Sequence, residues 1–407
     1  MKILIIMNYM YEEGTFEKYR GGICRYVPHL GKSIAEIPDT EVYAITYSKN
    51  SKKYIDGIHY IEHRNIDVIN TYLKNIRHIT NDSKTLSDIY HLSDQKYISK
   101  SIKTVHPDIV NIHGCMHGMF DYIETCELMK IPVIVTLHGL LGLDKVTVAD
   151  ESMKVIEKKL FMYADKNRLP LSVISSGIKR RARIGYKLKN TDNISVINNG
   201  IVANNIVENS KIKYLFKDNL KYVLCIGRIY NLKNQIMVVS AAEKVIDKGL
   251  NNIAVLFAGQ ETDGGELRNR ISASKYADHF TILGEMVYQD IIELYKHSHL
   301  NIIASVTEGF GLTAIEAMMF GVQTVMFSDL DAFTELNETG AIIGVNSRTA
   351  DALAEGIIQG INTAKSENEN LKKQAAKFQM NNIASEYVNV YKQIIQGVDY
   401  YENCHKG

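Results

Sequence analysis

Short apolar runs alternate with longer amphipathic segments along almost the whole chain of 407 residues. Near the beginning, the apolar run Lys2–Met7 precedes the helical pattern Gly22–Ile37. Further on, the helical pattern Thr85–Val105 precedes the apolar run Asp108–His113. Such alternation is typical of β-α-β units, whose parallel strands are buried between layers of helices. The sequence therefore predicts an α/β protein built on parallel sheets.

The predicted strands form two series. The first comprises Lys2–Met7, Glu41–Tyr47, Asp108–His113, Ile131–Leu137, Leu171–Ser175 and Ile194–Asn198. The second comprises Lys221–Ile226, Asn252–Ala258, His279–Leu283, His299–Ala304, Val322–Phe327 and Ala341–Ile343. Between the series, Asn198–Asn205 is a polar linker rich in turn formers. We therefore expect two doubly wound, Rossmann-like domains, residues 1–203 and 204–380, with a ligand held in the cleft between them.

The composition excludes several other classes of protein. Hydrophobic residues make up 45% of the chain and charged residues 23%, which excludes wholesale disorder. The five cysteines are scattered without a C-x-x-C pair, which argues against a disulfide framework and for a reducing compartment. The opening apolar run is too short for a secretory signal, and Ile131–Leu143 is too short to span a bilayer. We expect a cytoplasmic protein, either soluble or held to a membrane from its surface.

Charge is distributed unevenly along the chain, although the net charge is only +1. Residues 1–200 carry 28 basic and 22 acidic side chains, and the remainder carries 19 and 24. The basic excess is concentrated in one segment and consists of Lys154, Lys158, Lys159, Lys166, Arg168, Lys179, Arg180, Arg181, Arg183, Lys187 and Lys189. One interpretation is a solvated face. The other is a surface that attracts an anionic acceptor or an acidic membrane.

The most informative motif is the stretch from Thr307 to Gly321. A predicted buried strand leads into a turn with Gly309 and Gly311, and a helical pattern begins near Leu312. Glycines permit a close backbone approach, and the amides of a helix N-terminus attract phosphate. Glu308 lies before this turn and Glu316 lies about one turn inside the helix. Carboxylates on both sides of a phosphate site suit a sugar nucleotide, because one can bind the sugar and the other the ribose.

A second motif lies at the start of the second series, where the strand Lys221–Ile226 runs into Gly227-Arg228 and then Lys233-Asn234. Two cations on one strand-to-helix turn can neutralise a diphosphate leaving group without a metal. In isolation these residues would be interpreted as surface cations. Together with Glu308 and Glu316, they indicate a nucleotide diphosphate site.

At this point the chain resembles the retaining glycosyltransferases of family 4, within the glycosyl transferases group 1, which have the two-domain GT-B fold. The resemblance covers nearly the whole length and rests on Gly21-Gly22, Asp108–His113, Thr136–Gly139, Ser175–Gly177, Asn198–Gly200, Gly227-Arg228, Lys233-Asn234, Ala258-Gly259, Leu283-Gly284 and the pair Glu308 and Glu316.

The resemblance implies a role for each matching position of the second domain. Glu308 would contact hydroxyls of the donor sugar and Glu316 the ribose, while Arg228 and Lys233 would hold the diphosphate. The remaining donor contacts would be backbone groups, with the amides of Leu312 and Thr313 on the phosphates, Phe310 and Gly311 beside the sugar, and the segment from Leu283 to Val287 around the base.

Three further expectations follow from the resemblance. In the first domain, His138 would lie near the reacting carbon, and Gly21 and Gly22 would let that domain approach the phosphates. Residues 381–407 would contain a helix that packs back on the first domain. The group of catalytic residues would then be His138, Glu308, Arg228 and Lys233.

The predicted activity is the transfer of a hexosyl unit, with retention and without a metal or cofactor, from a nucleotide diphosphate sugar to a hydroxyl. The resemblance favours uridine as the base and a growing polysaccharide or lipid-linked glycan as the acceptor, in a bacterial type of biosynthesis. A small thiol-sugar or a protein is the second choice of acceptor. We expect no nucleic-acid partner.

Parts of the sequence admit four other interpretations. Gly309-Phe-Gly311-Leu-Thr-Ala314, followed by Asp329, fits a dinucleotide fingerprint and hence an NAD-dependent oxidoreductase, but it lies late in its domain and leaves both glutamates without a role. A non-catalytic GT-B partner subunit would typically lack the donor-site residues. Asp329-Leu-Asp331 forms a D-x-D, which we interpret as loop acids. His113 and His117 have the spacing of a metal pair, but cleft or strand-end histidines fit better.

Overall fold

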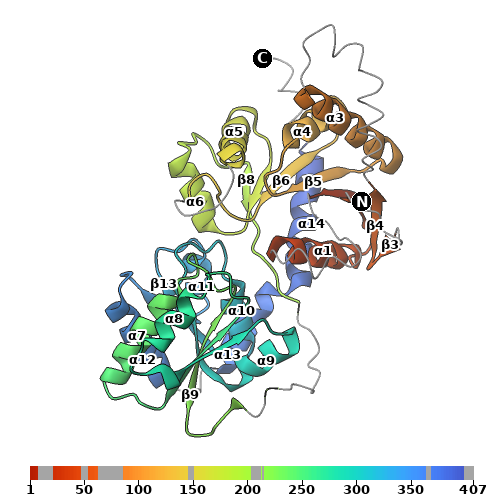
Figure 1. Cartoon of the computed structure of the whole chain (residues 1–407). Helices are drawn as coiled ribbons and strands as arrows, with labels where there is room; N and C mark the ends of the chain where they lie inside the picture. The colour runs from red at the N-terminus through yellow and green to blue at the C-terminus, as the bar shows by residue number, and fades with distance from the viewer. Residues whose placement is uncertain are drawn as a thin grey trace. The chain divides into compact units, whose positions relative to one another are not determined.

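The computed structural model describes residues 1–7, 22–46, 54–62, 86–144, 151–202, 212, 215–363 and 368–397. The chain divides into two compact units (Figure 1). The first consists of Met1–Ile174, Lys179–Asn198 and the segment from Met380 onward. The second consists of Ser175–Ile178 and Asn199–Gln379. Each unit contains one sheet, and both are dominated by parallel pairing, so the predicted α/β class with two parallel-sheet domains is confirmed.

The first unit has an eight-stranded sheet in the order β3-β4-β2-β1-β5-β6-β7-β8. Its strands are β1 (Lys2–Ile6), β2 (Glu41–Thr46), β3 (Tyr54–Ile55), β4 (Ile58–Glu62), β5 (Ile109–His113), β6 (Val133–Leu137), β7 (Leu171–Val173) and β8 (Ile194–Val196). All residues of β5 and β6 are buried, as expected for parallel strands covered on both faces. Its helices are α1 (Gly22–Ala35), α3 (Leu86–Val105), α4 (Met119–Leu128), α5 (Glu151–Asn167), α6 (Ser176–Gly185) and α14 (Met380–Gln396).

The sequence analysis missed the antiparallel pair β3–β4 at one edge of this sheet. Asp56 and Gly57 join the two strands with φ angles of 51° and 82°. Two consecutive positive φ values define the tight hairpin turn that matches the twist of the strands, and Asp-Gly is a favoured pair for it. Strand β3 has only two residues, and β4 alternates the buried Ile58 and Tyr60 with the exposed His59, so neither strand forms a continuous apolar run.

Helix α14 belongs to the first unit although it comes from the end of the chain. It packs against α1, and Tyr387 and Tyr391 are fully buried. Asn111 Nδ2 on β5 donates a 2.5 Å hydrogen bond to the Tyr391 hydroxyl. Asn111 Oδ1 in turn accepts from Thr136 Oγ1 on β6 at 3.0 Å. The Tyr391 hydroxyl of the last helix thus completes a row of hydrogen-bonded side chains that includes Thr136 and Asn111. This contact stabilises the unit, because buried polar groups without hydrogen-bond partners are destabilising.

The second unit has a six-stranded parallel sheet in the order β11-β10-β9-β12-β13-β14. Its strands are β9 (Lys221–Ile226), β10 (Ile253–Ala258), β11 (Phe280–Gly284), β12 (Ser298–Ile303), β13 (Gln323–Phe327) and β14 (Ile342–Val345). Its helices are α7 (Gln235–Asp247), α8 (Glu266–Ser272), α9 (Tyr288–His297), α10 (Leu312–Met319), α11 (Phe333–Asn337), α12 (Ala350–Asn362) and α13 (Asn368–Ala375). The strand order reverses between β9 and β12, and ligands of open α/β sheets bind at such a point, beyond the carboxyl ends of the strands.

Candidate functional site

The two sequence motifs of the second unit meet at this reversal. The loop after β9 carries Arg228 and Lys233, and the loop after β12 carries Glu308. The backbone N–H of Val306 donates to the carbonyl oxygen of Leu232 at 2.8 Å, which joins the two loops directly. Adjacent parallel strands therefore bring together side chains that are far apart in the sequence.

Lys233 and Glu308 form the centre of this arrangement. Lys233 Nζ lies 2.5 Å from Glu308 Oε2, and both side chains are mostly buried. Burial by itself would lower the pKa of Lys233, but the charge and hydrogen bond of Glu308 outweigh it, so the pKa is raised. Lys233 is therefore a fixed cation. Glu308 Oε2 also accepts from Ser305 Oγ at 3.2 Å.

Arg348 supports the Glu308 loop and was not found from the sequence. Its guanidinium donates to the carbonyl oxygens of Ser305 and Val306, at 2.9 and 3.0 Å. The same group forms a bidentate pair with Asp329, with both distances 2.9 Å. This fork geometry is specific to arginine. No motif surrounds Arg348 in the sequence, so nothing there could have identified it.

Arg228 is exposed on the first of the two loops. Its guanidinium carbon lies 5.8 Å from the centre of the Tyr230 ring, and Gln235 Nε2 donates to its carbonyl oxygen at 3.0 Å. The loop lies tightly on the turn after β10, where a Cβ on Gly259 would be 2.0 Å from the carbonyl oxygen of Gly227. Gly259, with φ near 150°, cannot be replaced without moving the Arg228 loop.

The residues after Gly259, whose role the sequence left open, also hold this loop. The N–H of Ile229 donates to the Gln260 carbonyl oxygen at 2.8 Å, and the N–H of Thr262 donates to the Ile229 carbonyl oxygen at 2.9 Å. The longer turn thus forms a short bridge with the Arg228 loop rather than a glycine-rich phosphate loop.

Helix α10 begins directly after the Glu308 loop. Gly311 adopts a left-handed conformation, with φ 76°, at the N-cap, and Leu312 and Thr313 supply the first helical amides. Such amides have no partner within a helix and favour an anion. The Phe310 side chain is buried against Phe378, with ring centres 5.8 Å apart, so it can face a ligand only through its backbone.

Glu316 lies further along α10 beside two tyrosines. Tyr295 donates a 3.0 Å hydrogen bond to Glu316 Oε2. Burial raises the pKa of Glu316 to about 7, and the Tyr295 hydrogen bond opposes that rise. Burial and Glu316 together raise the pKa of Tyr288 to about 12. A partly desolvated carboxylate next to hydroxyl groups is suited to bind a further hydroxyl, such as that of a ribose.

The predicted base segment leads from β11 to α9. Leu283 lies near the end of β11 and is partly buried. Val287, the N-cap residue of α9, is 62% exposed. An exposed aliphatic side chain at the carboxyl end of the sheet gives a flat apolar group a place to lie. The role of this segment in holding the base stays a prediction.

In the first unit, His138 follows β6 and contacts His113 at the end of β5. His113 Nδ1 lies 3.1 Å from His138 Nε2, and the rings are stacked with centres 5.4 Å apart. Burial and the neighbouring His138 lower the pKa of His113 well below its ordinary value, so it is neutral. The Tyr26 ring meets His138 edge-on. Of the predicted glycines, Gly22 is the first residue of α1, and Gly21 lies outside the described residues.

The residues of the two motifs that could suggest a metal have different surroundings. His113 is buried beside His138, whereas His117 is exposed on the following turn. Asp329 pairs with Arg348, as described above, and Asp331 is buried. Among the described residues, no group of three or more His, Cys, Asp or Glu side chains has the arrangement of a metal site.

Known proteins are similar to this chain in part of its sequence and in its fold. Residues 207–378, which include Arg228, Lys233, Glu308 and Glu316, match the family described as "Glycosyl transferases group 1". The whole chain has the fold of a crystal structure of a glycosyltransferase from Rickettsia africae, with a TM-score of 0.74 at 20% identity over 97% of this chain and 99% of the other. HepE of Anabaena in complex with UDP and glucose gives a TM-score of 0.68 at 17% identity, over 97% and 100%. The predicted GT-B fold is therefore confirmed.

Curated relatives match over shorter stretches. An uncharacterized glycosyltransferase of Methanocaldococcus jannaschii is 28% identical over 223 residues, which are 49% of this chain and 54% of that protein. The lipopolysaccharide core biosynthesis mannosyltransferase LpsB of Rhizobium meliloti is 31% identical over 140 residues, 32% of this chain and 39% of the relative. The chain thus spans about half or less of the length of these relatives. The chain therefore has the GT-B fold, and its residues 207–378 are similar to the glycosyl transferases group 1.

Proposed function

We propose that this protein is a retaining, metal-independent glycosyltransferase that moves a hexosyl unit from a nucleotide diphosphate sugar, with uridine as the favoured base, to a hydroxyl acceptor. The observation that carries the proposal is the Lys233–Glu308 pair at the strand-order reversal, next to the N-terminus of α10. A cation, a carboxylate and unpaired helix amides within one pair of adjacent loops suit a ligand that joins a diphosphate to a polyhydroxyl ring.

Each group has a task in the proposed reaction. The bond between the anomeric carbon and the diphosphate oxygen breaks, and Lys233, Arg228 and the amides of Leu312 and Thr313 stabilise the charge that develops on the diphosphate. The sugar passes through an oxocarbenium-like transition state. The acceptor hydroxyl then bonds to the anomeric carbon from the face that the diphosphate leaves, and its proton passes to the leaving phosphate oxygen. Attack on that face retains the configuration.

The remaining residues would position the donor. On donor binding, Glu308 would exchange part of its interaction with Lys233 for hydroxyls of the sugar, and the Lys233 ammonium would turn to the phosphates. Glu316 would accept from the ribose, and the segment Leu283 to Val287 would hold the base. His138 would contact the sugar from the first unit, with His113 fixing its ring. The name of the Rhizobium meliloti relative supports mannose as one transferred sugar and envelope polysaccharide or lipid-linked glycan as acceptor.

The decisive experiment is a donor screen that detects free nucleotide diphosphate from UDP-, GDP- and ADP-sugars, with the anomeric configuration of the product determined by NMR. We expect hydrolysis of one class of donor, retention, and full activity in EDTA, because fixed cations take the part of a metal. Loss of activity in EDTA and recovery with manganese would overturn metal independence and implicate Asp329 and Asp331. Tight NADH binding without UDP binding would favour the dehydrogenase instead.

A further inference from the structure

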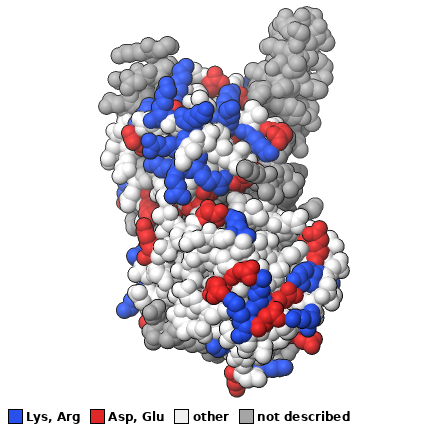
Figure 2. Space-filling view, turned by 90° about the vertical axis from the view of Figure 1, so that its left-hand side faces the viewer, with Lys and Arg blue, Asp and Glu red and all other residues white. Residues whose placement is uncertain are grey.

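The basic segment of the sequence forms one face of the first unit, made by α5 and α6. Figure 2 shows Lys and Arg side chains gathered over these helices. The two helices are neighbours, since Phe161 on α5 stacks on Tyr186 just after α6, with ring centres 5.0 Å apart. Tyr186 also donates a 2.6 Å hydrogen bond to Glu157. We call this surface the α5–α6 face, defined by the exposed residues Val155, Lys158, Lys159, Met162, Lys166, Arg180, Arg183, Ile184 and Lys187.

The inner side of each helix explains why these residues point outward. In α5 the buried positions are Glu157, Leu160, Phe161 and Ala164, and in α6 they include Ile178 and Ala182. Each set recurs at helical spacing and faces the core. The opposite side of each helix therefore faces solvent. It carries cations with aliphatic residues between them.

The acidic residues near this face are already engaged. Glu157 accepts from the backbone amides of Leu141 and Gly142 as well as from Tyr186. Asp165 accepts from the backbone amides of Lys189 and Asn190, and Glu151 pairs with Lys154 at 2.6 Å. Across the described part of the chain, no ion pair involves Lys158, Lys166, Arg180, Arg183 or Lys187. These cations are available to an external anion.

Large aliphatic side chains are exposed among them. Val155 is 65% exposed, Met162 49% and Ile184 71%. A soluble anion would leave these aliphatic side chains in water. Single-stranded nucleic acid is held by exposed aromatic rings, and none of the residues that define this face is aromatic. An anionic bilayer can bind both the cations and the aliphatic side chains of this face. Its headgroups attract the cations, and the aliphatic side chains enter the boundary of the acyl chains.

We infer that the α5–α6 face docks this protein on an anionic lipid surface. Its use in glycosyl transfer rests on the function proposed above and makes the acceptor a lipid-linked molecule at the membrane. Within the described residues, no helix is both long enough and apolar enough to cross a bilayer, so the docking that we infer is peripheral.

The test is sedimentation with phosphatidylcholine vesicles with and without phosphatidylglycerol, at low salt and without donor. We expect the protein to bind only the anionic vesicles and to be released by salt. The triple variant Arg180→Glu/Arg183→Glu/Lys187→Glu should lower the vesicle partition coefficient on the order of 100-fold or more, since each cation contributes about fivefold. The matched control is Lys217→Glu/Lys373→Glu/Lys377→Glu, which changes the net charge equally on the second unit and should bind like the wild type.

A second variant distinguishes lipid from a soluble anion. Val155→Ser/Met162→Ser/Ile184→Ser keeps every charge and should lower the partition coefficient roughly tenfold or more, because the inserted aliphatic surface is lost. Unchanged binding by this variant would assign the face to a soluble anion and overturn the inference, as would failure of the wild type to bind anionic vesicles. Circular dichroism and donor hydrolysis without vesicles should match the wild type in all variants. Failure of hydrolysis in the wild type would count against the proposed function and leave the vesicle result standing.

Discussion

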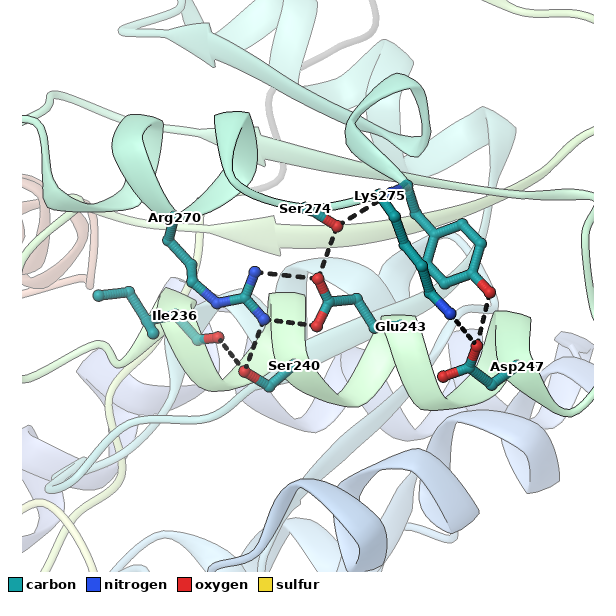
Figure 3. Close-up of polar contacts among 8 residues, drawn as sticks. Ile236, Ser240, Glu243, Asp247, Arg270, Ser274 and Lys275 are labelled. Carbon is teal, nitrogen blue, oxygen red and sulfur yellow. Dashed lines mark hydrogen bonds and ion pairs between the residues drawn. The ribbon is translucent and has the colours of Figure 1, made fainter.

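Two helical surfaces of this molecule are rich in lysine and arginine but use them in opposite ways. On the α5–α6 face of the first unit, the cations stand beside one another and beside exposed aliphatic side chains. On the surface of α7 and α8 in the second unit, each basic residue that Figure 3 shows faces an acid. Arg270 on α8 holds both carboxylate oxygens of Glu243 on α7, and Lys275 lies 2.9 Å from Asp247.

The paired surface is built to hold elements together. Ser274 adds a hydrogen bond to Glu243, and Tyr276 adds one to Asp247, so each acid is held from two sides. The hydrogen bond from Arg270 lowers the pKa of Glu243, while the Glu243 acceptor raises that of Arg270. The comparison teaches that the number of cations does not predict the role of a surface. On these two helical surfaces the position of the acids does, because Arg270 and Lys275 are held by Glu243 and Asp247, whereas no ion pair holds Arg183 on the described part of the chain.

The largest expected effect is at Lys233, where a paired cation lies in the candidate site. Lys233→Ala should slow donor turnover by about 100-fold or more, since a preorganised charge-stabilising group contributes roughly 2.7 kcal/mol or more to the transition state. Nucleotide affinity should fall as well. Lys166→Ala, on the α5–α6 face, is the matched control and should leave donor hydrolysis unchanged. A near-wild-type rate for Lys233→Ala would mean that the diphosphate binds elsewhere.

The next effect is on stability. Arg270→Met removes the partner of Glu243 and the tie between α7 and α8, and should lower the free energy of unfolding by about 1–2 kcal/mol, between the values for exposed and buried charged pairs. Urea denaturation measures it. The matched control is Arg183→Met, the same substitution at an arginine without an acidic partner among the described residues. It should change the free energy of unfolding by less than about 0.5 kcal/mol. Equal losses in the two variants would remove the distinction between the surfaces.

The stability effect of Arg270 should also depend on pH. Because the folded pKa of Glu243 is lowered, its stabilisation is present above the ordinary glutamate pKa and is lost as the pH falls through the folded pKa. The difference in unfolding free energy between wild type and Arg270→Met should therefore shrink when urea denaturation is repeated in acid. The difference for Arg183→Met should stay constant over the same range. A constant difference for Arg270→Met would show that the arginine acts by packing alone.

The smallest effect has the opposite sign. Arg180 and Arg183 lie three positions apart on α6, and like charges at this spacing repel. Arg183→Gln should therefore raise the free energy of unfolding by about 0.2–0.5 kcal/mol. The gain should disappear in high salt, where the repulsion is screened. A loss of stability instead would indicate that Arg183 has a structural partner.

The buried strands could be predicted well from the sequence, because a short apolar run is stable only where both of its faces are buried. Five-residue runs such as Val133–Leu137, which is apolar except for Thr136, are typical of central strands of a parallel sheet. The predicted and observed bounds of these strands differ by only a few residues, for local reasons. The strand expected from Ile131 begins instead at Val133, because Pro132 has no N–H to donate to the ladder. The hairpin at Asp56 and Gly57 was missed because β3 is short and β4 alternates buried and exposed residues instead of forming a continuous apolar run.

The candidate site could be predicted only in part. Loops that follow parallel strands meet at one edge of the sheet, so Arg228 and Glu308 could be expected near each other once the strands were known. The ion pair of Lys233 with Glu308 depends on the strand order, which a sequence does not display. Arg348 acts on the Glu308 loop through backbone carbonyl oxygens, and carbonyl oxygens carry no signature in a sequence. The functional roles of these residues stay predictions.

Helix α14 has a consequence for how the protein is made. Asn111 and Tyr391 are 280 positions apart, and the whole second unit is synthesised between them. At about 5–20 residues per second on the ribosome, the sheet of the first unit waits tens of seconds for the helix that covers it. During that time its polar chain at Asn111 and Thr136 lacks the tyrosine hydroxyl, and the apolar surface that α14 will cover is open to water. The first unit to be translated is thus the last to be completed. We expect chaperones to bind the incomplete first unit before α14 packs on it.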